Sequence, residues 1–213
     1  MRKRLAFIGA GSHADAVFLI LDKNRYKLVG YFDDKDINEH DGFPVLGKID
    51  DVEGFLKSGK IDSVFVTIGD NEKRQEVFDT LCPEFYNSFI NIISPTAIVL
   101  SKESIQGRGI FIGSGAFVGA KVSIADNTIV NTNSVVEHHT KIGSHVNIAP
   151  SVTINGICNI HDGCYLGSSS VLIQLIDVCP NTVIGAGAVV VKSIGQRGTY
   201  IGVPAKILNK ENV

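Results

Sequence analysis

The sequence predicts a chain of two parts, in which a small parallel α/β domain precedes a parallel β-helix. Over residues 1–92, apolar strand-like runs alternate with helix-like segments, which is typical of a parallel sheet. From Ile112 onward an aliphatic residue recurs at every sixth position, a period that fits neither an α-helix nor hairpin strands. The period changes near Pro95, so we expect domains of residues 1–92 and 93–213.

The first domain is expected to be half of a Rossmann-like fold, with strands and helices in alternation. Apolar runs and helical spacing predict, in order, a strand over 4–9, a helix over 14–22, a strand over 26–32, a short helix over 50–56, a strand over 63–68, a helix over 71–81 and a strand over 88–93.

The turn after the first strand is a candidate phosphate site. Residues 9–13 (GAGSH) follow a strand and open a helix, where backbone N–H groups and a helix N-terminus can receive phosphate. Asp33 and Asp34 end the second strand, where a carboxylate can bond ribose hydroxyls. The domain is small, so a nucleotide or nucleotide sugar fits it better than a dinucleotide. The alternative is a tight strand–helix turn that binds no ligand.

The repeat of the second domain is unbroken over fourteen hexads. Its aliphatic column is Ile112, Val118, Ile124, Val130, Val136, Ile142, Ile148, Ile154, Ile160, Leu166, Leu172, Val178, Ile184 and Val190. A second column of mostly small residues follows four positions later, so each hexad predicts one short strand and one corner around a packed interior. Glycines directly follow several aliphatic residues, where we expect a tight corner to favour a residue without Cβ.

Composition narrows the class of protein. Apolar residues make up 44% and charged residues 20% of the chain, which is ordinary for a globular protein. A net charge of −2 gives no electrostatic reason to expect nucleic acid or an anionic membrane as partner. No apolar stretch is long enough to span a membrane, so a cytoplasmic protein is expected. The four cysteines lack C-x-x-C spacing, which disfavours a zinc or redox motif.

Four of the six histidines, namely His138, His139, His145 and His161, lie in the repeat. Interior positions are aliphatic, so these side chains are expected at corners or on outward faces. One explanation is a general base, because imidazole titrates in the range that acyl transfer to an amine or hydroxyl needs. A second is a zinc site like that of β-helical carbonic anhydrases, but the spacings do not match that arrangement and no metal is expected. Surface histidines without a role are the third.

Short motifs in both halves of the chain make the functional prediction more specific. They are GAGSH (9–13), FDDK (32–35), PVLG (44–47), IGDNEKR (68–74), NTNSVVEHH (131–139), SHV (144–146), NG (155–156) and GVPAK (202–206). Together they resemble the bacterial sugar acyltransferases related to sialic-acid O-acetyltransferase and the UDP-4-amino-sugar N-acetyltransferases, within the hexapeptide-repeat transferase superfamily. The resemblance implies a left-handed β-helix with three hexads in each coil, acetyl-CoA as co-substrate, and a homotrimer with active sites between subunits.

The resemblance also assigns roles to residues. His138 is expected to be the general base, with Glu137 beside it. A nucleotide sugar would be held by Gly11, Ser12, His13, Asp33, Asp34, Lys35, Gly69 and Asn71. Acetyl-CoA would be held by His145, Gly156, Gly167, Gly185, Ala186, Gly187, Gly202, Pro204 and Lys206. Of these, His145 would lie beside the thioester, and the N–H of Gly156 would approach its carbonyl, where a donor stabilises an oxyanion.

The chain departs from the family pattern at two positions. Some members carry a Glu directly after the catalytic His, where it can orient the imidazole, and this chain has His139 there. Glu137 precedes His138, and adjacent strand residues point to opposite faces, so the group that orients His138 is left open. Ser12 stands where many members have Gly, which could alter the sugar pocket.

The expected function is direct acetyl transfer from acetyl-CoA to an amino group of a nucleotide-linked sugar, in bacterial surface-glycan synthesis. The alternative is O-acetylation of sialic acid or another sugar hydroxyl, since the same base and donor serve either acceptor. A nucleotide-binding β-helix without catalytic activity is a third possibility, in which His138 would be dispensable.

Overall fold

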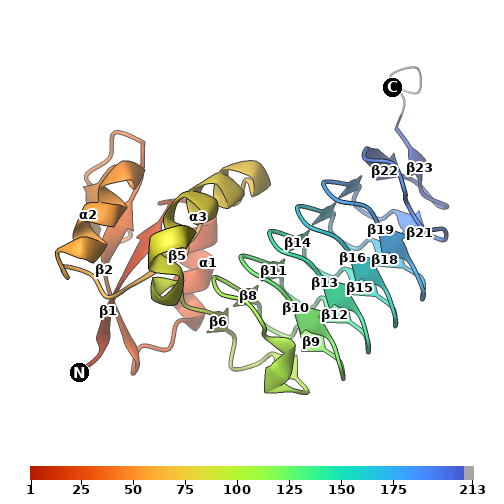
Figure 1. Ribbon diagram of the computed structural model, residues 1–213, viewed down its shortest axis with the longest axis horizontal. Helices are drawn as coiled ribbons and strands as arrows, with labels where there is room; N and C mark the ends of the chain where they lie inside the picture. The colour runs from red at the N-terminus through yellow and green to blue at the C-terminus, as the bar shows by residue number, and fades with distance from the viewer. Residues whose placement is uncertain (209–213) are drawn as a thin grey trace. The chain divides into compact units, whose positions relative to one another are not determined.

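The computed structural model describes residues 1–208, which divide into two compact units at Ile92 and Ile93 (Figure 1). The first is an α/β unit and the second a β-helix. Among the helices of the described residues, none is long and apolar enough to cross a membrane.

The α/β unit is built on a five-stranded sheet in the order β3-β4-β2-β1-β5. The parallel strands are β1 (Lys3–Ile8), β2 (Tyr26–Phe32), β4 (Phe43–Gly47) and β5 (Ser63–Val66), and β3 (Glu39–His40) runs antiparallel to β4. The helices are α1 (Ser12–Ile20), α2 (Val52–Lys57) and α3 (Asn71–Phe85), with short 3₁₀ turns η1 (Ile49–Asp51) and η2 (Tyr86–Ser88).

The two faces of this sheet form separate cores, because successive strand residues point to opposite sides. Ala6 and Ile8 of β1 belong to the cluster that includes residues of α2 and α3. Phe7 faces the other way and contacts the rings of Tyr31 and Phe65, with centroids 5.9 and 6.3 Å away. On that face Phe43 links Tyr31 to Phe18 of α1, so α1 covers one side of the sheet and α2 and α3 cover the other.

Several predicted elements differ in detail from those observed. The hairpin of β3 and β4 was not expected, because Glu39–His40 is short and polar and β4 contains Pro44. The strand predicted over 88–93 is wrong for most of its length. A 3₁₀ turn covers Tyr86–Ser88, Phe89 forms an isolated bridge to Val64, and only Ile92–Ile93 is a strand. Helix α3 continues past Pro83 to Phe85, since a proline in the last turn removes only one helical hydrogen bond.

The second unit has the predicted coil structure. Its strands are β6 (Ile92–Ile93), β7 (Ile98–Val99), β8 (Phe111–Ile112), β9 (Phe117–Val118), β10 (Ser123–Ile124), β11 (Ile129–Val130), β12 (Val135–Val136), β13 (Lys141–Ile142), β14 (Asn147–Ile148), β15 (Thr153–Ile154), β16 (Asn159–Ile160), β17 (Tyr165–Leu166), β18 (Val171–Leu172), β19 (Asp177–Val178), β20 (Val183–Ile184), β21 (Val189–Val190), β22 (Thr199–Ile201) and β23 (Lys206–Ile207). They form three sheets, and partners among the strands from β8 to β21 lie eighteen residues apart, as Val130 and Ile148 do.

This pairing means that three hexads make one coil, as predicted. Every member of the aliphatic column is buried in one continuous core, from Ile112 to Val190. The earlier hexads add a further coil, because β7 pairs with β9 and Ile105 bridges to Ile124. The α/β unit followed by a left-handed parallel β-helix is therefore confirmed as the fold class.

About half of the small column consists of Ser, Thr or Cys, and hydrogen bonding explains these residues better than volume alone. Five of its side chains donate a hydrogen bond to the carbonyl fifteen residues later, namely Thr128 to Gly143, Ser134 to Ala149, Thr140 to Asn155, Cys158 to Ile173 and Cys164 to Cys179. Buried carbonyls at the corners thereby gain partners. Burial raises the pKa of the Cys164 thiol to about 11, so this cysteine is a structural donor and not a nucleophile.

The glycines after the aliphatic column serve a different purpose from the one expected. A Cβ on Gly113 would lie 2.8 Å from the backbone N of Thr132, and a Cβ on Gly167 would lie 2.6 Å from that of Ala186. Close stacking of successive coils therefore excludes a side chain there. The left-handed backbone conformation falls two positions later, at residues such as Asn133 and His139.

Candidate functional site

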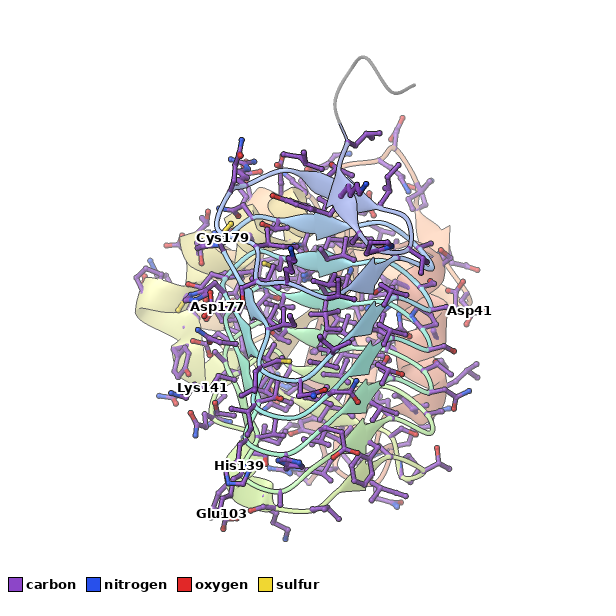
Figure 2. The ribbon with its side chains drawn as sticks, turned by 90° about the vertical axis from the view of Figure 1, so that its right-hand side faces the viewer. Asp41, Glu103, His139, Lys141, Asp177 and Cys179 are labelled. Carbon is purple, nitrogen blue, oxygen red and sulfur yellow. The ribbon has the colours of Figure 1, made fainter. Side chains whose placement is uncertain are left out.

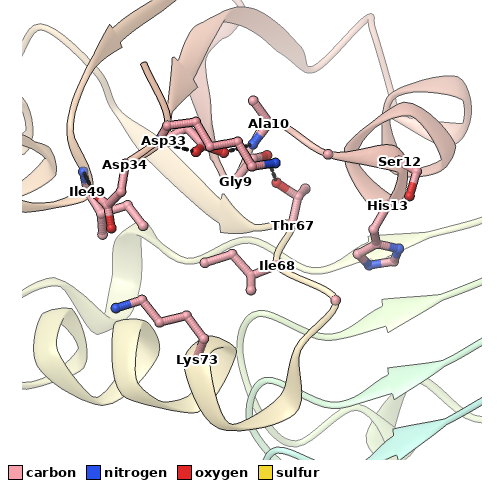
Figure 3. Close-up of a pocket in the computed structure, with 13 residues that line it drawn as sticks. Gly9, Ala10, Ser12, His13, Asp33, Asp34, Ile49, Thr67, Ile68 and Lys73 are labelled. Carbon is pink, nitrogen blue, oxygen red and sulfur yellow. Dashed lines mark hydrogen bonds between the residues drawn. The ribbon is translucent and has the colours of Figure 1, made fainter. Parts of the chain in front are cut away.

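A cleft of about 510 Å³ opens at the carboxyl edge of β1, β2 and β5 in the α/β unit (Figure 3). Its lining residues are Gly9, Ala10, Gly11, Ser12, His13, Asp33, Asp34, Lys35, Ile49, Thr67, Ile68, Gly69 and Lys73. Seven of the eight predicted substrate residues are among them, and Asn71 is the exception. The cleft is large enough for part of a nucleotide sugar.

The turn between β1 and α1 brings the start of a helix to the cleft. Gly9 has a φ of 107°, and a Cβ there would lie 2.8 Å from Cγ1 of Ile68. Gly11 is the N-cap of α1, it has no side chain to cap the helix, and its carbonyl accepts a hydrogen bond from the N–H of Ala14 at 2.8 Å. The helix N-terminus, with the positive end of the helix dipole, suits a phosphate.

Asp33 connects the turn after β1 to the loop after β2, and both line the cleft. The residue is 8% exposed, and its carboxylate accepts hydrogen bonds from the backbone N–H of Ala10 at 2.7 Å and of Lys35 at 2.8 Å. Figure 3 shows it beside Gly9 and Ala10. A carboxylate has about four acceptor positions, so it can still receive a ribose hydroxyl. Asp33 therefore fixes the glycine turn in addition to its expected role as a ligand.

Residues that follow β4 also hold the loop after Asp33 in place. Asp34 accepts a hydrogen bond from the backbone N–H of Ile49 at 3.1 Å. The ammonium of Lys48 donates to the carbonyls of Asp34 and Lys35, at 3.0 and 3.1 Å. The exposed side chain of Lys35 is left at the cleft, where it can reach an anionic ligand.

His13 and Arg74 set the electrostatics behind the cleft. Burial, and then the positive charge of Arg74, lower the pKa of His13 to about 4, so its ring is neutral at pH 7. Burial lowers the pKa of Arg74 to about 10, and it keeps its charge. The guanidinium donates to the side-chain oxygen of Asn71, which explains why Asn71 does not line the cleft.

Thr67, Ile49 and Lys73 line the cleft without having been predicted. The hydroxyl of Thr67 donates to the carbonyls of Ile8 and Gly9, at 3.0 and 2.5 Å. Lys73 lies in the first turn of α3, after the N-cap Asp70, and pairs with Glu76 at 3.1 Å. A lysine in the first helical turn after a glycine-containing strand end is a signal that could have indicated Lys73.

In the β-helix, His138 lies exposed at a corner with its ring against a glycine of the next coil. A Cβ on Gly156 would lie 2.5 Å from Cε1 and 2.8 Å from Nε2 of His138. A Cβ on Gly119, in the preceding coil, would lie 2.9 Å from the backbone N of His138. Glycine on both sides therefore permits the histidine to occupy this place.

The neighbour of the His138 ring is His139. The two Nδ1 atoms are 3.1 Å apart, and the rings meet edge to face with centroids 5.3 Å apart. Glu137 instead accepts from the backbone N–H of His138 at 3.3 Å. His139 has a φ of 59°, and this left-handed corner turns it back toward its neighbour. The structure thus offers His139 as the orienting group that the family pattern left open.

Next to this pair lies an unused donor and an apolar corner. Among the described residues, the backbone N–H of Gly156 has no hydrogen-bond partner, while its carbonyl accepts from Leu175 at 3.1 Å. Ile157 and Leu175 occupy left-handed corner positions and are 52% and 64% exposed. Exposed aliphatic side chains in this conformation are unusual.

The other two histidines of the repeat lie in different settings. His145 is 7% exposed, and its Nδ1 is 2.9 Å from the side-chain nitrogen of Asn127. His161 contacts Asn159 at 2.8 Å and Asp177 at 3.4 Å. Figure 2 shows His139, Lys141 and Asp177 along one side of the β-helix.

The remaining residues predicted to bind acetyl-CoA lie in the last coils. A Cβ on Gly185 would lie 2.7 Å from Cγ2 of Ile201, so this glycine has a packing role like that of Gly167. Gly187 and Gly202 have positive φ angles of 68° and 91°. Ala186, Pro204 and Lys206 are exposed, around β22 and β23.

Comparisons with known proteins match both units. The family model of the PglD N-terminal domain matches residues 4–81. The model of the bacterial transferase hexapeptide (six repeats) matches residues 121–156.

Solved structures match over nearly the whole chain. The acetyltransferase domain of PglB from Neisseria gonorrhoeae FA1090 is 30% identical, with a TM-score of 0.89, and the match covers 97% of this chain and 100% of that one. A structure of that domain in complex with acetyl coenzyme A matches with a TM-score of 0.87 and 29% identity, over 98% of this chain and 100% of that one. PerB from Caulobacter crescentus, in complex with CoA and GDP-perosamine, is 28% identical with a TM-score of 0.86, over 96% of this chain and 97% of that one.

Proposed function

Because this chain belongs to the hexapeptide-repeat acetyltransferases that carry a PglD-type N-terminal domain, we propose that it N-acetylates a nucleotide-linked amino sugar. The donor would be acetyl-CoA. The observation that carries the proposal is the joint presence of the phosphate-suited cleft and the His138–Gly156 pair in one chain. PerB, which matches both units, has CoA and GDP-perosamine bound in its structure.

The cleft of the α/β unit would hold the nucleotide. The N-terminus of α1 would receive phosphate oxygens, and Lys35 and Lys73 would add positive charge. Asp33 would accept a ribose hydroxyl with the acceptor positions that Ala10 and Lys35 leave free. Neutral His13 would act by hydrogen bonding and packing, not as a cation.

His138 would be the general base. Its Nδ1 faces His139, so Nε2 is the atom left to take a proton from the attacking amine. The sugar nitrogen forms its bond to the acetyl carbon, the bond from that carbon to sulfur breaks, and the proton passes from His138 to the leaving thiolate. The buried pKa-raised Cys158 and Cys164 are poor nucleophiles, which favours direct transfer over an acyl-enzyme.

His139 would orient His138 in place of the Glu found in some relatives. One Nδ1 must donate and the other accept, so the contact needs at least one neutral ring. A His139→Glu variant should keep most of the activity, while His139→Ala should lower kcat about tenfold with little change in KM. Equal kcat values for wild type and His139→Ala would contradict this role.

Gly156 would supply the oxyanion donor. Its N–H has no partner among the described residues, and it lies beside the ring that takes the proton. As the thioester carbonyl becomes tetrahedral, negative charge develops on its oxygen, and a fixed amide donor stabilises it. His145 and the exposed residues Ala186, Pro204 and Lys206 would bind the rest of acetyl-CoA.

We also propose that the active protein is a homotrimer. The exposed aliphatic corner of Ile157 and Leu175 lies next to the His138–Gly156 pair, and a second copy would cover it. Leu175→Glu should shift the protein toward monomer in light scattering and abolish turnover. Leu100→Glu, at a site 57% exposed, is the matched control and should change neither.

The proposal is tested by acetyl-CoA consumption with a panel of nucleotide-linked amino sugars, with free and CMP-linked sialic acid alongside. Turnover with an amino sugar, and an N-acetyl product by mass spectrometry, is the expected result. Turnover only with sialic acid would establish the O-acetyltransferase alternative. Binding of nucleotide without turnover of any acceptor would favour a non-catalytic role.

A further inference from the structure

The amino edge of the α/β sheet, opposite the cleft, concentrates positive charge. Strands β1 and β2 begin there, since Lys3 pairs with Tyr26 and Arg4 with Lys27. The exposed charged side chains at this edge are Arg2, Lys3, Arg4, Lys23, Arg25, Lys27 and Lys60, with the carboxylates Asp22 and Asp62. The local charge is therefore +5, in a chain whose net charge is −2.

Most of these cations are not neutralised within the chain. Arg4 forms a bidentate pair with Asp62, and Asp22 accepts from the backbone N–H groups of Asn24 and Arg25. Within residues 1–208, none of the other six cations forms a salt bridge with a carboxylate. Six cations without a carboxylate partner therefore lie on one edge, and this charge is complementary to an anionic partner.

An apolar hollow lies among these cations. It has a volume of about 220 Å³ and is lined by Arg2, Phe18, Leu21, Lys23, Tyr26, Lys27, Leu28 and Phe43. Its floor is apolar, and the three basic side chains stand around it. Leu19, which follows the lining residue Phe18 in the last turn of α1, is 77% exposed, and Met1, which precedes the lining residue Arg2, is fully exposed.

We propose that this amino edge docks the α/β unit on an anionic lipid bilayer. Basic side chains would meet the phospholipid head groups, and Leu19, Met1 and the hollow would meet the apolar boundary below them. The cleft is at the carboxyl edge of the same sheet, so the docked unit keeps it open to water. The enzyme would thereby work at a membrane surface.

A nucleic acid is the competing anionic partner, and two observations disfavour it. Lys23 and Arg25 already cover a face of Phe18 and of Tyr26, at 4.2 and 5.3 Å from the ring centroids, which leaves less aromatic surface for base stacking. Exposed Leu19 gains nothing from a phosphodiester backbone, whereas a bilayer buries it.

The test is co-sedimentation of the full chain with vesicles of phosphatidylcholine alone or with about one third phosphatidylglycerol. Binding is expected only to the phosphatidylglycerol vesicles and should weaken as salt is raised. Each cation near an anionic surface contributes about fivefold to partitioning, so Lys23→Gln/Arg25→Gln/Lys27→Gln should bind about 100-fold more weakly. The matched control Lys102→Gln/Arg108→Gln/Lys141→Gln, on exposed sites of the β-helix unit, should bind like wild type.

A second pair of variants separates docking from a folding defect. Leu19→Ser should lower partitioning severalfold, while Leu100→Ser, at a site 57% exposed, should not. All variants should keep the circular dichroism spectrum and melting temperature of wild type. Equal binding of wild type to both vesicle types, equal losses in the two triple variants, or tighter binding to a DNA duplex than to vesicles would overturn the proposal.

Discussion

Asp33 in the α/β unit is 8% exposed and accepts two backbone N–H groups, whereas His138 in the β-helix is exposed at a corner with its ring against Gly156. In the α/β unit, strand ends and a helix N-terminus already form a cleft, and side chains such as Asp33 hold its loops in place. In the β-helix every hexad has the same backbone structure. A functional site there therefore depends on individual side chains that differ from the repeat pattern, such as His138. The first unit is suited to binding, and the second supplies reactive groups on a uniform scaffold.

Among the changes that test this division of roles, removal of the general base should lower activity the most. We expect His138→Ala to lower kcat about 1000-fold, because the amine would lose its proton acceptor, while KM for the nucleotide sugar stays within about twofold. Steady-state kinetics with both substrates measures this. The matched control is His161→Ala, whose ring pairs with Asp177 elsewhere on the β-helix and whose loss should leave kcat unchanged. Wild-type turnover by the His138→Ala enzyme would contradict the assignment of His138 as the general base.

A methyl group at Gly156 should give the second-largest loss of activity. In Gly156→Ala the new Cβ would lie 2.5 Å from Cε1 of His138 and must displace the ring. We expect kcat to fall about 30-fold through loss of base alignment, with the fold intact by circular dichroism. Gly195→Ala is the control, because no atom lies within 4 Å of a Cβ there, and it should retain full activity. If both variants lose equally, the His138–Gly156 contact has no part in catalysis.

Asp33→Asn should affect binding and not chemistry. An amide can replace one of the two carboxylate acceptors but not the charge, so the glycine turn and the ribose contact both weaken. We expect KM for the nucleotide sugar to rise about tenfold while kcat at saturation changes less than twofold. The neighbouring Asp36→Asn, at an exposed site, should leave KM unchanged. A fall in kcat without a change in KM would assign Asp33 to the reaction itself.

The last prediction concerns the stability of the fold and rests on His13. Its pKa is about 4 in the folded chain and ordinarily 6.5, so the unfolded state takes up a proton first as the pH falls. The free energy of unfolding should therefore drop by about 2.5 kcal/mol between pH 6.5 and pH 4, and this part of the drop should be absent in His13→Gln. Urea unfolding of both proteins at about pH 7 and pH 4.5 measures it. His40→Gln is the control, and the same pH dependence in wild type and His13→Gln would contradict the assignment.

The two units also differ in how far the sequence predicts them. The column from Ile112 to Val190 repeats one environment fourteen times, so errors at single positions cannot hide it. In the α/β unit each element occurs once, and the β3–β4 hairpin was missed because pairing with β2, not local pattern, makes Phe43–Gly47 a strand.

The site was predictable where it follows from strand ends or from the repeat, and less so where it depends on side-chain conformation. The cleft residues Gly11, Ser12 and Asp33 follow directly from the ends of β1 and β2. The eighteen-residue coil places His138 next to Gly156, but neither the contact of His138 with His139 nor that of Arg74 with Asn71 can be read from the pattern. The glycine column was also explained wrongly, because coil stacking is a distance between coils and not a property of one turn.

The most direct test of the division between the two units uses one assay with two acceptors. Turnover of a nucleotide-linked amino sugar and of the same sugar without its nucleotide is compared for wild type, Asp33→Asn and His138→Ala. We predict that Asp33→Asn lowers kcat/KM only for the nucleotide-linked sugar, while His138→Ala lowers it by the same large factor for both. An equal loss for both sugars in Asp33→Asn would contradict the account, because binding of the nucleotide and acetyl transfer would then not be separable between the units.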